Sequence, residues 1–156
     1  MGLDIYAYRK IRKVNAIVDE DGYVVDPVTR ERVEYAFVAY VDTKCACRAE
    51  EVEDSAVYSA EDCFSFGAGR YSWHNSWKRQ LMLIAFDSSA FSELINFSDC
   101  EGTIGAAVSA KLAKDFSDYQ DRANAFWDNA SECREVYADW RKAFEMAAED
   151  GAVVFL

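Results

Sequence analysis

The sequence predicts an α+β fold in one domain, residues 1–156, with an N-terminal antiparallel sheet packed against three helices. Segments rich in alternating, β-branched and aromatic residues fall mainly in the first half of the chain, whereas apolar residues at helical spacing dominate the second half. A short apolar segment, residues 152–156, then predicts a strand that closes the sheet. This order differs from the regular alternation of strands and helices in doubly wound folds. A length of 156 residues suits a single hydrophobic core.

The first half of the chain supplies the strands of this sheet. Strands are expected at residues 3–8, 14–18, 23–25, 33–41 and 63–66. The acidic turn from Asp19 to Gly22 suits a hairpin, and it lacks the later ligands that a calcium loop needs. The segment VEYAFVAYV, residues 33–41, gives the strongest strand signal. No element is assigned to residues 42–62.

Apolar residues at helical spacing predict three amphipathic helices that pack on the sheet. They are expected at about residues 73–86, 104–127 and 132–149. Ser72 and Ser131 are expected as N-caps, and Thr103 opens the longest helix. Gly151 ends the last helix. Residues 94–97 are expected to form a short strand or a buried turn.

The chain carries 28 acidic and 17 basic residues, which gives a net charge of −11. This charge predicts no direct binding to nucleic acid or to an anionic membrane, because binding to phosphates needs clustered lysine and arginine. The charge is uneven: residues 9–13 are basic, whereas residues 115–150 hold ten acids and four bases. An acidic surface of this kind is usually only solvated, but it could also bind a basic surface of a host protein or imitate DNA.

Five cysteines in a chain of this size predict free thiols instead of a disulfide framework. The residues after Met1 include neither a basic segment nor an apolar run, and no apolar run approaches the length of a membrane span. We therefore expect a cytoplasmic protein with no membrane partner. No motif indicates a cofactor.

Catalytic or metal chemistry is a minor alternative. Three cysteines and the only histidine could together bind zinc: Cys45, Cys47, Cys63 and His74. The C-x-C spacing is tighter than the usual zinc knuckle, and no second close pair exists. A hydrolase would need His74 as general base beside Cys63 or Cys100. Asp99 or Glu101 could orient that histidine, but the sequence does not show that these groups meet.

Two similar junctions, each with glycine before a predicted helix, lie at residues 67–72 and 99–103. Glycine lets the backbone approach a ligand, and a helix N-terminus offers N–H groups and a positive dipole end. Arg70 and Ser72 suit a phosphate or carboxylate. Asp99 and Glu101 suit hydroxyls or an amine, and the aromatic residues suit a flat ring. The candidate ligand-binding residues are Arg70, Tyr71, Ser72, Trp73, His74, Asp99, Glu101 and Thr103.

The same features also have an ordinary structural explanation. Glycine before a helix is common, acids stabilise a first helical turn, and the i, i+4 spacing of Trp73 and Trp77 suits a core. Neither junction matches the P-loop or the dinucleotide-binding fingerprint. A ligand pocket and simple helix capping are therefore both open.

Three segments carry a resemblance to known proteins: the opening MGLDIY, the YSxxxxW stretch at residues 71–77 and INFSDCEGTIG at residues 95–105. In this order they resemble an uncharacterised family of small proteins from bacteria and tailed phages, over most of the chain. The third segment is the most specific. The family has no assigned activity or catalytic residue, so the resemblance implies only a setting. A phage setting implies a counter-defence or host-takeover role, such as holding a nucleotide signal or masking a host enzyme.

These observations favour a binding protein over an enzyme, with a small polar or nucleotide-derived ligand held at residues 67–105. One alternative is an acidic interaction protein or DNA mimic whose helices, residues 104–149, inhibit a host enzyme. The second is a small hydrolase that uses His74 with a carboxylate or a thiol. The sequence specifies neither the ligand nor the oligomeric state.

Overall fold

The computed structural model describes residues 2–97 and 100–156 and confirms the α+β fold class. The strands are β1 (Asp4–Arg9), β2 (Arg12–Lys13), β3 (Ile17–Val18), β4 (Val24–Val25), β5 (Ala36–Val38), β6 (Val57–Ser59), β7 (Asp62–Gly67), β8 (Gly102–Gly105) and β9 (Ala152–Phe155). The helices are α1 (Tyr71–Ile84), α2 (Ser92–Ile95), α3 (Ala106–Asp118), α4 (Gln120–Phe126) and α5 (Glu132–Ala147), with a short 3-10 helix, η1 (Thr43–Arg48). Among the described helices, none has the length and apolar character that crossing a membrane requires.

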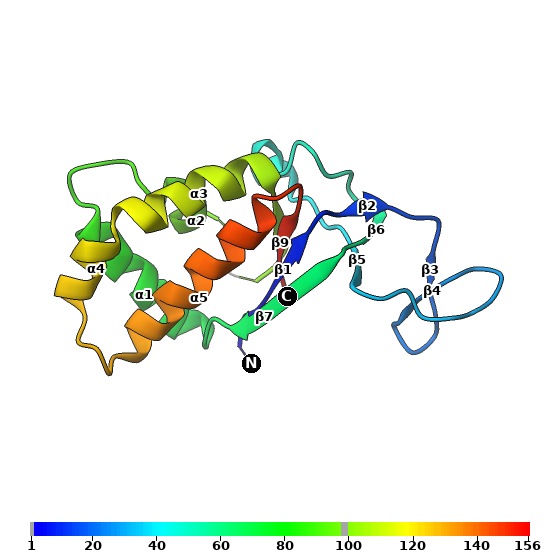
Figure 1. Ribbon diagram of the computed structural model, residues 1–156, viewed down its shortest axis with the longest axis horizontal. Helices are drawn as coiled ribbons and strands as arrows, with labels where there is room; N and C mark the ends of the chain where they lie inside the picture. Colours follow the sequence, from blue (N-terminus) through cyan, green and yellow to red (C-terminus); the bar gives the residue numbers. More distant parts are fainter. Residues whose placement is uncertain (1, 98–99) are drawn as a thin grey trace.

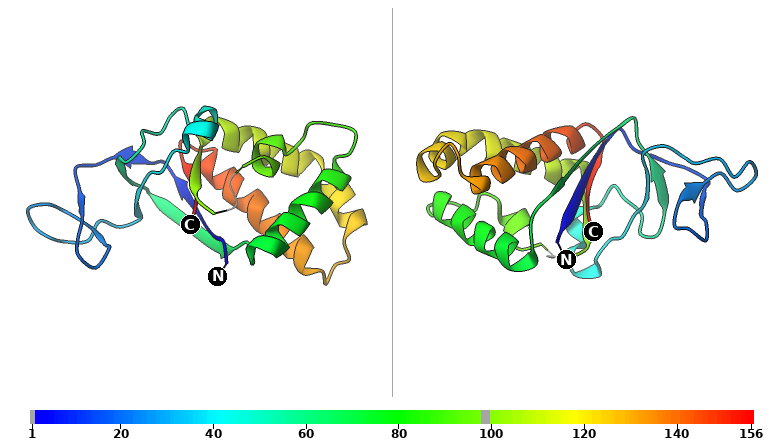
Figure 2. Two further views of the ribbon diagram at one scale, coloured as in Figure 1. Left: turned by 180° about the vertical axis from the view of Figure 1, so that it is seen from behind. Right: turned by 90° about the horizontal axis from the view of Figure 1, so that it is seen from below.

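A central antiparallel sheet of four strands, in the order β7-β1-β9-β8, separates two layers of the molecule (Figure 1). The predicted closing strand is confirmed as β9, which lies between β1 and β8. Ile5 of β1 pairs with Phe66 on one side and with Phe155 on the other. The right panel of Figure 2 shows the helices on one side of this sheet and the outer strands on the other.

The helices and one face of the central sheet enclose the larger hydrophobic core. Trp77 of α1 and Trp140 of α5 are fully buried in it, and alternate sheet residues such as Ile5, Ala7 and Val153 complete it. Burying a large apolar side chain stabilises the fold by roughly 1.5–3 kcal/mol. Helices α1 and α5 lie within two residues of the predicted ranges 73–86 and 132–149 at each end.

The opposite face of the sheet carries the intervening residues of the same strands. Tyr8 and Val154 belong to a second hydrophobic cluster with Phe37 and Tyr58. The latter two residues come from the small sheet β2-β6-β5, which covers part of this face. The two faces therefore carry separate cores.

The predicted hairpin forms a projecting arm, residues 14–34, at the end of the molecule away from the helices (Figure 1). Strand β3 pairs with β4, and Oδ1 of Asp19 accepts hydrogen bonds from the N–H groups of Asp21 and Tyr23. Gly22 completes the turn with a φ of 86°, which favours glycine. This hairpin is confirmed, although its strands are only two residues long.

The longest predicted helix is wrong at two places. It begins at Ala106, because Thr103 and Ile104 belong to β8 and pair with β9. Ile104 is buried in a strand, but it lies four residues before Val108. This i, i+4 spacing made the predicted helix appear to begin earlier than it does. The helix is also interrupted at Tyr119, which separates α3 from α4.

Three further boundaries differ from the prediction. The strand expected at residues 33–41 shrinks to the three residues of β5, because Tyr35 adopts a left-handed φ of 47° and ends the extended conformation. Residues 94–97 complete the short helix α2 and the turn after it. The N-cap position of α1 is held by Arg70 instead of Ser72, because the helix begins at Tyr71, two residues earlier than expected.

Candidate functional site

The first predicted junction forms the start of α1. Arg70 and Ser72 are exposed, and the Arg70 side chain makes no capping hydrogen bond. Gly69 has a φ of 87°, and a Cβ atom there would lie 2.8 Å from Cε3 of Trp73. Trp73 therefore closes over the glycine turn, and together with Tyr71 it packs against the helix-side core. Local packing accounts for this junction.

His74 lies on the buried face of α1. Its ring centroid is 6.2 Å from that of Trp77 and 5.8 Å from that of Trp140. Cys63 packs on the opposite face of the sheet, where burial and the nearby Asp62 carboxylate raise the pKa of its thiol. A nucleophilic cysteine needs a lowered pKa. The geometry gives no support to a hydrolase that pairs His74 with Cys63.

The second predicted junction leads through β8 into α3, and the N-terminus of α3 is already occupied. Oε1 of Glu51 accepts a hydrogen bond of 2.7 Å from the N–H of Ala107, so this carboxylate takes the position expected for a ligand anion. Thr103 is buried in β8, and Glu101 is exposed. Asp99 lies outside the described residues. An external anion would have to displace Glu51.

The candidate zinc ligands are spread over both faces of the sheet. Cys45 packs against the helix-side core, whereas Cys47 is exposed on η1. Cys63 and His74 lie in different cores, as described above. Within residues 2–97 and 100–156, no group of three or more histidine, cysteine, aspartate or glutamate side chains could hold a metal ion.

Much of the surface charge is paired within the chain. Ion pairs join Arg9 to Asp62 and Glu149, Lys13 to Glu53, Lys111 to Asp115, Lys114 to Asp118 and Arg141 to Glu145. Exposed pairs contribute at most about 1 kcal/mol each to stability. They do reduce the basic character of residues 9–13 and the acidic character of α3 and α5.

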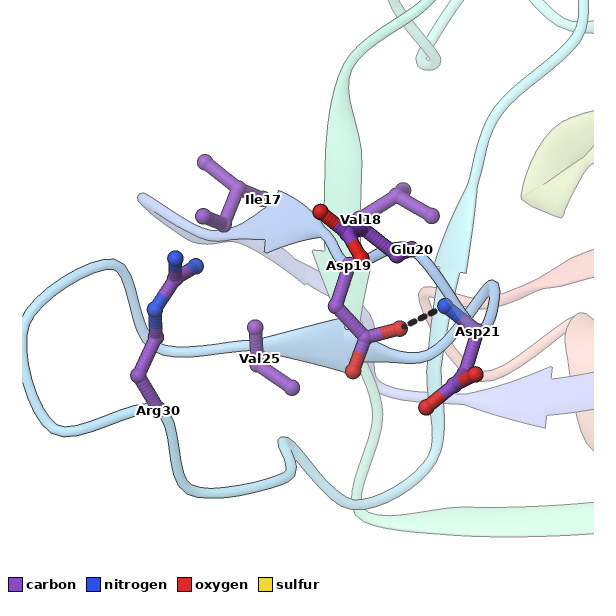
Figure 3. Close-up of a pocket in the computed structure, with 7 residues that line it drawn as sticks. All are labelled: Ile17, Val18, Asp19, Glu20, Asp21, Val25 and Arg30. Atoms are coloured by element: carbon purple, nitrogen blue, oxygen red, sulfur yellow. Dashed lines mark hydrogen bonds between the residues drawn. The ribbon is translucent and has the colours of Figure 1, made fainter.

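One hollow, of about 460 Å³, lies over a face of the hairpin arm (Figure 3). Ile17 and Val25 lie across its middle, with Asp19 and Asp21 at the turn end and Arg30 on the other side. The Asp19 carboxylate is already bonded to the turn backbone. All of its lining residues belong to this arm, and a two-stranded ribbon on its own is a marginal scaffold, so this hollow is a poor support for a ligand.

A second hollow, here called the arm groove, lies between the central sheet and the hairpin arm. Its volume is about 390 Å³, within the range of roughly 300–1,000 Å³ that is usual for ligand pockets. Strands β1 and β9 form one wall, β5 forms a second, and the hairpin forms a third. The lining residues are Tyr6, Tyr8, Val18, Gly22, Val24, Ala36, Phe37, Val38, Val154 and Leu156.

Stacked aromatic rings extend from the arm groove into the second core. The ring centroids are 6.5 Å apart for Tyr6 and Tyr8, 4.3 Å for Tyr8 and Phe37, and 5.7 Å for Phe37 and Tyr58. Rings of this kind offer an apolar surface to another flat ring. Burial, with smaller contributions from Cys63 and Tyr6, raises the pKa of Tyr8 far above its ordinary value. A tyrosine phenol is protonated at neutral pH even with its ordinary pKa, so Tyr8 can donate a hydrogen bond, and the raised pKa extends this to higher pH.

The chemistry of the arm groove is that of a binding site. Among its described lining residues, the tyrosine hydroxyls are the only titratable side-chain groups. These residues provide no acid–base pair and no thiolate. Shape, stacking and one or two hydrogen bonds are what such a lining can contribute to a ligand.

Sequence reasoning missed the arm groove. None of the predicted ligand-binding residues that the structure describes lines it. A usable signal was the period of two in β1 and β9, which places Tyr6 and Tyr8 on one sheet face together with Val154. That signal identifies the face but not the hairpin that forms its third wall.

Comparison of the chain with models of known protein families, with curated proteins and with solved structures gives no match. The resemblance to the bacterial and phage family therefore stays a prediction. Function has to be argued from the geometry of the chain itself.

Proposed function

We propose that the protein is a small-molecule-binding protein, and that the arm groove holds a flat, mainly apolar ligand with one hydrogen-bond acceptor. The observation that supports this most is the combination of three walls, a volume of about 390 Å³ and an apolar lining that includes stacked rings. Burial of apolar ligand surface contributes roughly 25 cal/mol per Å². The protonated Tyr8 phenol donates a hydrogen bond to the acceptor.

This ligand class is less polar than the one expected from the sequence. Both the expected and the proposed ligand contain a flat ring. Arg70 and Ser72 do not line the arm groove, however, so no cation there engages a phosphate. The counter-defence or host-takeover role depends on the family resemblance alone and stays a prediction. Inhibition of a host enzyme by the acidic helices likewise stays a prediction.

The proposal can be tested with 2-acetonaphthone, a flat bicyclic ketone, as probe. Val38 lines the arm groove and is 41% exposed, so Val38→Trp fills the groove from β5 without emptying the core. Val28 is 86% exposed on the arm and does not line the groove, so Val28→Trp is the matched control. In a titration followed by NMR, the wild type and Val28→Trp should bind the probe, and Val38→Trp should bind at least about ten-fold more weakly. Equal binding by both variants would contradict the proposal.

The role of the Tyr8 hydroxyl can be separated from that of its ring. Tyr8→Phe should weaken binding of 2-acetonaphthone about five-fold, because one hydrogen bond of about 1 kcal/mol is lost. Binding of naphthalene, which has no acceptor, should not change. An equal loss for both probes would mean that Tyr8 acts through packing and not as a donor.

A further inference from the structure

The outer side of β7 is an uncovered edge of the central sheet. This strand is six residues long, and in the described part of the chain no strand pairs with its outer side (Figure 1). Natural proteins commonly protect such edges with lysine, proline or a bulge. The sequence of β7, DCFSFG, contains neither lysine nor proline, and its register with β1 is continuous over all six residues. The edge is therefore open to another strand.

The hydrogen-bonding pattern of the sheet fixes which backbone groups of β7 point outward. Asp4 exchanges backbone hydrogen bonds with Leu156, so its N–H and C=O face β9. Alternate residues of a strand face opposite sides, so Ile5 faces β7, and its partner Phe66 faces β1. The outward groups of β7 are then those of Cys63, Ser65 and Gly67.

One of these outward donors is already satisfied. The N–H of Cys63 donates to Oδ1 of Asp62 at 2.8 Å. Ser65 and Gly67 are both exposed, and their N–H and C=O groups form the part of the edge that another strand can reach. A strand placed there antiparallel to β7, as all the neighbours in this sheet pair, gains at least two residues of ladder.

An acidic flank of α5 runs beside this edge. Nζ of Lys142 lies 4.0 Å from the ring centroid of Phe64 in β7, which places this side of α5 along the strand. Asp139 and Glu135 lie one and two turns, respectively, before Lys142 on the same side of the helix. Glu135 is exposed and Asp139 is half-buried. Side chains of an added strand that point toward the helices would face these two carboxylates and the Lys142 ammonium, which together carry a net charge of −1.

We propose that the outer edge of β7 binds an extended segment of a partner protein by antiparallel strand addition, and that basic residues alternate with apolar ones in that segment. The basic side chains point to the α5 flank, and their methylene stems cover the half-buried rings of Phe64 and Phe66. A second copy of this chain is disfavoured as the occupant. Two acidic α5 flanks would meet across such a pair, in chains that each carry a net charge of −11.

The probe is a fluorescein-labelled peptide of alternating valine and lysine in which each lysine backbone nitrogen is methylated. Its valine N–H groups then form the only bonding edge, and a strand that uses this edge antiparallel to β7 directs its lysine side chains to the helix side. A second peptide carries the methyl groups on valine. Its lysine N–H groups then form the bonding edge, and in the antiparallel orientation its valine side chains point to the helix side. A third has glutamate in place of lysine. Fluorescence anisotropy should show binding of the first peptide and at least about ten-fold weaker binding of the other two.

Variants of the protein test the same edge. Ser65→Pro removes the outward N–H while Phe64 and Phe66 keep their bonds to β1, and it should weaken binding at least about ten-fold. Ser65→Ala keeps the N–H and should bind as the wild type does. Reversal of charge in Glu135→Lys with Asp139→Lys should weaken binding of the lysine peptide about five-fold or more, with no such loss for the glutamate peptide.

Three results would overturn the proposal. The first is equal binding of the two differently methylated peptides, a result that does not depend on any variant folding. The second is unchanged binding by a folded Ser65→Pro protein. The third is a dimer in light scattering that Ser65→Pro dissociates, which would make a second copy the occupant. The arm groove is on the other side of the sheet from α5, so none of these results bears on its ligand.

Discussion

Removal of the Glu51 carboxylate should destabilise the start of α3. This side chain accepts a hydrogen bond of 2.7 Å from the N–H of Ala107, and it places a negative charge at the positive end of a 13-residue helix. Loss of a capping side chain costs roughly 0.5–2 kcal/mol, and loss of a charge at this end costs roughly 0.3–1 kcal/mol. Because Glu51 is exposed, we expect Glu51→Ala to cost about 1.5 kcal/mol in total. Glu51→Gln retains an acceptor and should cost about 0.5 kcal/mol.

Gly105 provides a second, independent test of the same contact. A Cβ atom at this position would lie 2.1 Å from Oε2 of Glu51 and 3.3 Å from Cα of Ala49. The φ of Gly105 is −81°, which any residue can adopt, so the cost of Gly105→Ala arises from these contacts and not from the backbone. The added methyl group must push the Glu51 carboxylate off the helix terminus. In the Glu51→Ala background that part of the cost disappears.

The assay is thermal and urea denaturation of the wild type, both single variants and the double variant. A loss of about 1.5 kcal/mol should lower Tm by about 3–6 °C in a domain of this size. The double variant should lose about 1 kcal/mol less free energy of unfolding than the sum of the losses in the two single variants. Strict additivity, or a Glu51→Ala protein as stable as the wild type, would refute the assignment of Glu51 as the cap of α3.

Two further predictions concern packing and pH. Gly151→Ala should cost about 3 kcal/mol or more in urea unfolding, because its Cβ atom would lie 1.8 Å from the Tyr8 carbonyl oxygen. The control Gly67→Ala, whose Cβ atom would lie 3.9 Å from Asp4, should change stability by less than about 0.5 kcal/mol. Burial raises the pKa of Asp139, so its ionisation costs stability as the pH rises through that folded-state pKa. Asp139→Asn should therefore raise Tm at neutral pH but not at about pH 3; an equal change at both pH values would contradict this.

The sequence allowed most of the scaffold to be predicted. The period of two in residues 3–8 and the apolar segment at residues 152–156 identified two adjacent strands of the central sheet, and helical spacing identified α1 and α5. The failure at β8 has a specific cause. A buried strand of four residues that runs straight into a helix leaves no polar break, so Ile104 and Val108 fit one continuous helical pattern.

The candidate site was much less accessible to sequence reasoning. Glu51, which occupies the N-terminus of α3, comes from a segment to which no element was assigned and acts on a residue 56 positions later. The arm groove depends on four segments: β1, the hairpin and β5 from the start of the chain, and β9 from its other end. Period-two patterns in β1 and β9 identify one wall, but a hairpin with two-residue strands gives little signal of where it will lie.

The central claim is that the space between the hairpin arm and the central sheet holds a ligand. The most direct measurement is of intermolecular nuclear Overhauser effects between protein protons and the ring protons of 2-acetonaphthone. Contacts should appear at the Val154 and Val38 methyl groups and at the ring protons of Tyr6 and Tyr8. Contacts confined to other surfaces, such as the exposed side chains of α1, would contradict the claim.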